Sequence, residues 1–216
     1  SWWMRELNTS RNESKDSYKN PVESFKSKLR WQDNENWFDC DGVSLLAYAV
    51  SNNNNCVVRV LLDTMKEKFE GEDYTRILDS RVRDQGYVSL GIPGRCTALV
   101  GAMAWASPDV VAMLLNAGAN VKSVDIMGSD AFMFASILGR SKNLQCWPER
   151  VQDWDLNRQN TVLGGSALGN AVYMGANKLE TVKVLLDAGA SLDYRTFGGG
   201  SVLTSLTTSE DSDLDV

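Results

Sequence analysis

The chain has 216 residues, of which 43% are hydrophobic and 23% are charged, a balance typical of folded proteins rather than disordered ones. Its formal net charge is −6, which argues against nucleic-acid binding, because that affinity comes from Lys and Arg neutralising phosphates. An acidic membrane surface would repel such a chain as well.

Residues 1–38 are predicted to form an N-terminal arm and a capping helix. The first 20 residues are polar apart from Trp2 and Trp3. From Asn20 to Glu23 the sequence has an N-cap residue, a Pro in the first turn and a Glu behind it, which is typical of a helix start. We therefore expect a short amphipathic helix that ends near Trp31.

A turn followed by two helical segments recurs along the rest of the chain. The residue that would cap the first helix of each unit is a Ser, Thr or Asp. These positions are 53, 33, 36 and 35 residues apart and are Ser44, Thr97, Asp130, Ser166 and Ser201. A period near 33 with two helices per unit predicts a repeat array, in which each unit packs against its neighbours.

The first unit is followed by a segment that does not fit the period. Its outer helix is predicted from Cys56, taken as part of the buried stripe, to about Phe69. Residues 71–95 then form a non-repeat insertion, which explains the long first spacing. A helix is expected from Tyr74 to Val82, followed by a loop.

The later units differ in their outer helices. Ser107 and Pro108 begin the second outer helix, and Gly118 takes the left-handed position after it. Pro148 interrupts the third outer helix. In the fourth unit Asn177 and Glu180 are predicted to form a capping box, with Leu186 on the buried side.

A fifth unit begins at Ser201 and is only partial. Residues 207–216 are rich in Asp and Glu and are predicted to form an acidic tail.

The run Val110–Ala119, its parallel at Thr181–Ala190, and the turns in register with them resemble the ankyrin-repeat family, whose unit reads G-x-T-P-L-H-x-A-A, then V-V-x-L-L-L, then G-A. The resemblance covers residues 39–206 apart from the insertion. It implies an all-α ankyrin-repeat solenoid of about four helix-turn-helix units plus a partial fifth, with irregular insertions. The turn His of the family is missing, because its positions hold other residues: Ala47, Val100, Met133, Gly169 and Thr204. We therefore expect other groups to brace neighbouring loops.

The resemblance also implies a partner-binding groove made of hairpin turns and the exposed side of the inner helices. Its residues are mostly apolar, and a contiguous apolar patch marks a surface that something covers. By register they are Trp105, Ile126, Met127, Ile137, Leu138, Val162, Leu163, Tyr173, Met174 and Phe197. Trp2 and Trp3 are predicted to make a second contact. Alternatively, the chain covers the groove itself with residues 71–95, residues 149–160 or the N-terminal arm.

No grouping of residues predicts catalysis, a cofactor or a metal site. The chain has no His, so the common hydrolases that use an imidazole base are excluded. Four scattered cysteines without a CxxC pair predict free thiols in a reducing compartment, namely Cys40, Cys56, Cys96 and Cys146. No apolar run is long enough to span a bilayer and no apolar signal run opens the chain, so we expect an intracellular, cytoplasmic protein.

The sequence therefore predicts a non-catalytic protein–protein interaction module, a scaffold or accessory subunit of a larger assembly. The alternative is a regulatory adaptor that captures a peptide or a domain in its concave groove, and an enzyme is a remote alternative. The predicted partners are other proteins, without nucleic acid and without membrane insertion.

Overall fold

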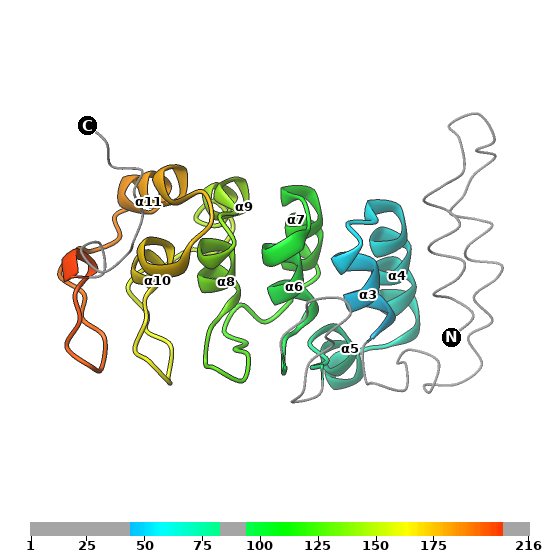
Figure 1. Ribbon diagram of the computed structural model, residues 1–216. Coiled ribbons are helices and arrows are strands. Elements are labelled where there is room, and N and C mark those ends of the chain that lie inside the picture. The colour runs from blue at the N-terminus through cyan, green and yellow to red at the C-terminus, as the bar shows by residue number, and fades with distance from the viewer. Residues whose placement is uncertain (1–43, 83–93, 205–216) are drawn as a thin grey trace.

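The computed structural model describes residues 44–82 and 94–204 (Figure 1). The predicted capping helix, Trp2, Trp3, Cys40 and the acidic tail lie outside these residues. Within the described ranges the chain forms helices and no strands, apart from two isolated β-bridges, so the prediction of an all-α fold is confirmed there. The helices are α3 (Leu45–Ser51), α4 (Asn55–Lys68), α5 (Gly71–Leu78), α6 (Ala98–Trp105), α7 (Pro108–Asn116), α8 (Ala131–Ile137), α9 (Ser141–Cys146), α10 (Ala167–Met174) and α11 (Lys178–Asp187).

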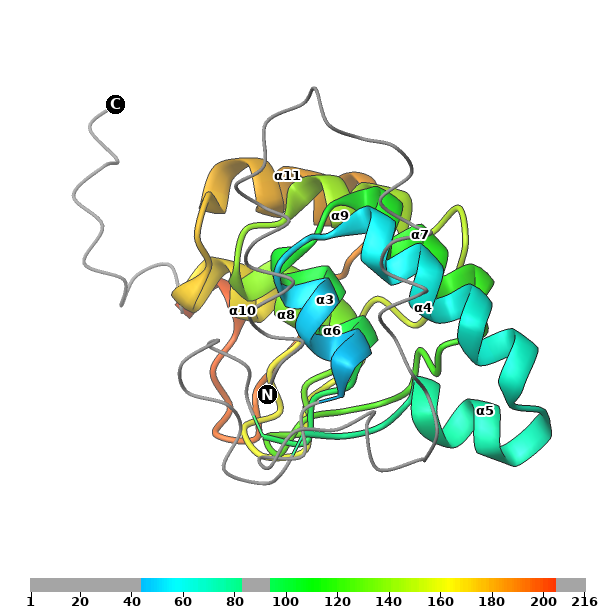
Figure 2. The ribbon, with the colours of Figure 1, turned by 90° about the vertical axis from the view of Figure 1, so that its right-hand side faces the viewer.

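Consecutive helices pair, and the pairs are arranged in a row. Helices α3, α6, α8 and α10 form an inner row in which each contacts the next, and α4, α7, α9 and α11 form an outer row in the same way. Seen along the row, the inner helices lie behind one another and the loops that precede them extend to one side (Figure 2). Each inner helix therefore contacts its outer partner and its neighbours in the inner row.

The inner helices begin where a short polar side chain caps the first turn. The side-chain oxygens of Ser44, Thr97, Asp130 and Ser166 each accept a hydrogen bond from the backbone N–H three residues further along. The Oγ of Ser201 accepts the same bond from Thr204, where another helical turn begins. Such a cap satisfies one of the N–H groups that a helix start leaves unpaired. The five positions found from the sequence spacing are all capping residues.

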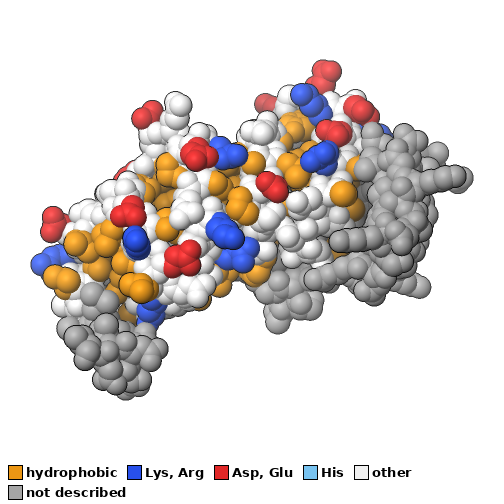
Figure 3. Space-filling model, turned by 90° about the horizontal axis from the view of Figure 1, so that it is seen from above, with side chains coloured by type: hydrophobic (Ala, Val, Ile, Leu, Met, Phe, Trp, Pro, Cys, Tyr) orange, Lys and Arg blue, Asp and Glu red, His pale blue; other side chains and the backbone are white. Residues whose placement is uncertain are grey.

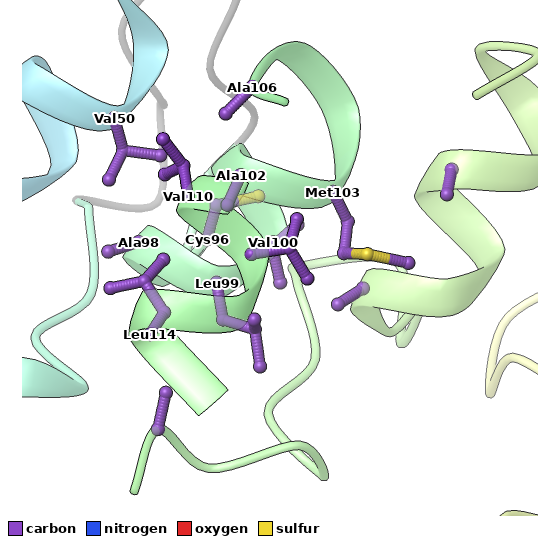
Figure 4. Close-up of a cluster of buried hydrophobic side chains, with 14 of the residues drawn as sticks. Val50, Cys96, Ala98, Leu99, Val100, Ala102, Met103, Ala106, Val110 and Leu114 are labelled. Carbon is purple, nitrogen blue, oxygen red and sulfur yellow. The ribbon is translucent and has the colours of Figure 1, made fainter. Parts of the chain in front are cut away.

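The core is continuous along the row because the inner helices are rich in small and aliphatic residues. Around α6, the side chains of Leu99 and Met103 are completely buried, and Ala98 and Ala102 let neighbouring helices approach closely. Figure 4 shows this cluster, in which Val50 comes from α3 and Met103 extends towards α8. One buried cluster thus joins successive helix pairs.

The outer helices follow the sequence predictions in part. Helix α4 ends at Lys68, and α9 ends at Cys146, ahead of Pro148, as expected. The prediction for Cys56 was wrong, because the buried stripe of α4 begins at Val57 and the thiol of Cys56 faces solvent.

The insertion helix α5 also begins and ends earlier than predicted, at Gly71 and Leu78. Glu72 and Asp73 lie in its first turn, where they interact favourably with the helix dipole. Beyond Leu78 the carboxylate of Asp79 accepts a hydrogen bond from the Asn120 backbone, and the chain leaves the helix.

The predicted capping box of α11 is wrong. Asn177 has a left-handed backbone with φ of 47° and makes no side-chain cap bond, whereas a capping residue needs an extended backbone. The carboxylate of Glu180 instead accepts a hydrogen bond from the Ser141 hydroxyl of α9 at 2.8 Å. Leu186 is 39% exposed rather than buried, because no further outer helix covers α11 within the described residues.

Polar side chains at the start of α9, in the third helix pair, cap the C-terminal end of α6. The buried Asn143 amide donates hydrogen bonds to the carbonyls of Met103 and Ala106, both at 3.0 Å. The guanidinium of Arg140 donates a second bond to Ala106, at 2.8 Å. No backbone N–H of α6 donates to these carbonyls, as is usual at the end of a helix. Their hydrogen bonds therefore come from the next helix pair along the row.

We expect Asn143→Ala to destabilise the chain by about 1–3 kcal/mol, because it leaves the buried Met103 carbonyl of α6 without its side-chain donor. Urea denaturation measures the free energy of unfolding. The control is Asn116→Ala on the exposed end of α7, where a surface change costs about 0.5 kcal/mol or less. Equal losses in the two variants would contradict the role of Asn143 between neighbouring pairs.

Candidate binding surface

Three hairpin loops project from the same side of the row, at residues 119–130, 157–166 and 190–201 (Figures 1 and 2). A polar side chain near the start of each turn accepts backbone N–H groups from inside the turn. The Asp125 carboxylate accepts from Met127 and Ser129, the Asn160 amide oxygen from Leu163 and Gly164, and the Thr196 hydroxyl from Gly200. Each turn is thus held by its own polar side chain.

The apolar residues of these turns point outwards. They are between 43% and 66% exposed, which is unusual for large apolar side chains. We call them the tip stripe, and its members are Ile126, Met127, Val162, Leu163 and Phe197.

The hairpins lie against one another, so the tip stripe is continuous. The backbone N–H of Phe197 donates to the Leu163 carbonyl of the second hairpin at 3.2 Å, and the N–H of Ile126 donates to the Gly94 carbonyl in the loop before α6 at 3.1 Å. Between the first two hairpins, Gly128 approaches so closely that an added Cβ would lie 2.7 Å from the backbone nitrogen of Thr161. The three turns therefore form one edge.

Other side chains brace the loops in the absence of a turn His. The guanidinium of Arg81 donates to the Val124 carbonyl at 2.6 Å, and the Gln159 amide donates to the Arg195 carbonyl at 2.8 Å. The Asn157 side chain accepts from the backbone of Ser191 in the next loop at 2.7 Å. These bonds join successive loops and hold the hairpins in a row.

The predicted groove residues on the inner helices lie apart from the tip stripe. Trp105, Ile137 and Leu138 are half-buried, and Tyr173 is exposed; Met174 ends α10, and its side chain lies outside the described part. All of them are at the C-terminal ends of inner helices, whereas the hairpins precede the N-terminal ends. A helix of seven or eight residues separates the two ends by about 11 Å. The structure thus divides the predicted set into two groups.

The described parts of the proposed covering segments contact the outer row. The Tyr74 hydroxyl of α5 donates to the Ala117 carbonyl behind α7. Trp154 lies edge-on to Trp147, with ring centroids 5.3 Å apart, and the guanidinium of Arg158 lies over the Trp154 ring. Residues 83–93 and the N-terminal arm lie outside the described part of the chain.

The acidic groups of the first hairpin are turned inwards. Burial raises the pKa of Asp130, an effect that the Met133 N–H and the nearby Arg158 offset only in part. The pKa of Asp125 is also raised by burial. Burial raises the pKa of the Cys96 thiol to about 12, so at neutral pH this thiol is protonated and a poor nucleophile.

The outer side of the row is mixed in character. Lys, Arg, Asp and Glu side chains are interspersed there with hydrophobic ones (Figure 3). A hollow of about 590 Å³ lies between α4, α5 and α7, with Leu62, Phe69, Tyr74 and Met113 among its lining residues. The sequence did not predict this hollow, because it depends on where α5 folds back.

No model of a known protein family matches the sequence, and no curated protein matches it. Within the described ranges, no group of three or more His, Cys, Asp or Glu residues is placed to hold a metal ion. No helix in those ranges has both the length and the apolar character needed to cross a membrane. The tip stripe is therefore the feature of this part of the chain that most needs a functional explanation.

Two glycine substitutions test whether the hairpins hold one another. Gly118 and Gly128 both have left-handed backbones, but only Gly128 has a neighbouring hairpin against it. We expect Gly118→Ala to cost about 1–2 kcal/mol for the backbone alone, and Gly128→Ala to cost more because its Cβ displaces Thr161. Urea denaturation measures both costs, and equal values would contradict the contact between the first two hairpins.

Proposed function

We propose that this chain is a non-catalytic protein–protein interaction module, a scaffold or accessory subunit of a larger assembly, built as a divergent member of the ankyrin-repeat family. The family assignment is supported by paired helices in two rows, by five capping residues of which the last four are spaced 33 to 36 residues apart, and by hairpins on one side. The observation that carries the function is the tip stripe.

The tip stripe has the physical properties of an interface. Burying a large apolar side chain contributes about 1.5–3 kcal/mol, so five exposed ones favour association with another surface. The turns are already ordered by their own polar side chains and by bonds between hairpins. A partner would therefore lose little free energy in fixing them, which is the advantage of a preorganised surface.

Three buried groups that could do chemistry are used for structure. Asp130 caps a helix, Asp125 closes a turn, and Cys96 is a buried thiol with a raised pKa. The insertion helix α5 and the aromatic segment around Trp154 add surface beyond the helix pairs. These features favour a binding role within an assembly over catalysis.

Two serine substitutions in the tip stripe test this function. We expect Leu163→Ser combined with Phe197→Ser to abolish co-purification of partner proteins from an extract of the native cells, with little change in melting temperature, because both side chains are exposed. The matched control is Leu179→Ser on α11, whose side chain is 86% exposed and lies away from the hairpins. Quantitative mass spectrometry compares the proteins retained by each variant.

If the double variant retains the same proteins as the unchanged chain, the tip stripe is not the interface. A loss of binding in Leu179→Ser alone would place the interface on the outer row instead.

A further inference from the structure

The exposed charge beside the tip stripe is mostly positive, although the whole chain is negative. Arg81 donates to the carbonyl of Val124, two residues before Ile126. Lys122 is exposed in the same hairpin, and Arg195 is exposed two residues before Phe197. None of these three cations forms an ion pair within the described residues.

Of the acids in the same region, Asp79 interacts with Arg81, and the others neutralise little of this charge at the surface. Asp125 and Asp130 are 5% and 1% exposed, and their carboxylates are used by backbone N–H groups of the first hairpin and of α8. Asp79 accepts a bond from Asn120. Among the described residues of the three hairpins, Asp193 is the one acidic residue that is exposed. Cations thus flank both ends of an apolar stripe.

We propose that the tip stripe binds an acidic polypeptide segment of a partner protein, with apolar residues that contact the tips and carboxylates that face Arg81, Lys122 and Arg195. This inference rests on the proposed function and adds the chemistry of the partner to it. Complementary charge around an apolar contact speeds association and selects partners.

The spacing of the hairpins sets the pattern of the partner. Packed helices lie about 8–10 Å apart, and the hairpins follow the spacing of the inner helices. A segment in the polyproline II conformation rises about 3.1 Å per residue and has three residues per turn. Apolar side chains at every third residue of such a segment lie on one face, about 9 Å apart, and would therefore meet successive tips.

Nucleic acid and anionic membranes are less suited to this surface. Affinity for either comes from many cations acting against phosphates or acidic headgroups. The proposal uses three cations beside the tip stripe, Arg81, Lys122 and Arg195, on a chain of net charge −6. A protein segment gains from the apolar residues as well, and so uses the whole surface.

Fluorescence anisotropy with labelled synthetic peptides of 12 residues tests the proposal on the full chain. The probe has Leu at every third position and Asp or Glu elsewhere; one control peptide has Lys in place of the acids, and another has Ser in place of Leu. We expect the acidic Leu peptide alone to bind, and to bind several-fold more weakly when NaCl is raised from 50 to 300 mM, because salt screens exposed charges.

Charge reversal identifies the surface that the peptide contacts. We expect Lys122→Glu and Arg195→Glu each to weaken binding about three- to fivefold at low salt, since exposed charge pairs contribute modestly. Lys183→Glu on α11 changes the net charge by the same amount away from the hairpins, and it should bind the peptide as the unchanged chain does.

The proposal is overturned if the acidic Leu peptide does not bind, if the Lys peptide binds as well, or if both hairpin variants retain full affinity. Tighter binding to vesicles containing 30% phosphatidylserine than to the peptide would overturn it in favour of a membrane surface. If the peptide fails but Leu163→Ser with Phe197→Ser still loses co-purified proteins, the proposed function stands and only the acidic partner is wrong. If that double variant loses nothing, the function itself fails.

Discussion

Each turn of the hairpin row depends on a polar side chain that accepts backbone N–H groups from its own loop. Asp125, Asn160 and Thr196 do this in successive hairpins, and the caps at the following inner helices continue the same pattern. These polar groups are turned inwards, whereas the large apolar residues of the same turns, the tip stripe, are exposed. The bonds that order each loop thus also hold the tip stripe towards solvent.

The helix pairs position these loops. Small residues on the inner helices allow close packing, and the buried Asn143 ties α9 to the C-terminal carbonyls of α6. Bonds from Arg81 and Gln159 then connect one loop with the next. The stack sets the spacing of the hairpins, and the loop bonds hold them in line, so the interaction surface proposed above is a product of both.

Local signals predicted the helices better than they predicted the surface. Cap residues such as Thr97 and Asp130 act within one turn, and sequence spacing was enough to find them. The capping box at Asn177 failed because Glu180 contacts Ser141 of another helix, which no local pattern encodes. Sequence register also joined Trp105 and Tyr173 to the hairpin tips, although a whole helix length separates them. The extent of α5 and the inward turn of Asp125 likewise depend on tertiary contacts.

In the function proposed above, another protein covers the apolar hairpin tips. A photoreactive benzoylphenylalanine in place of Phe197, irradiated in the native cell extract, tests this most directly, with the same group in place of Leu179 as the reference. We expect a crosslink from position 197 to a different polypeptide and a much weaker one from position 179. Crosslinks from position 197 solely to other segments of this chain, or none at all, would contradict it.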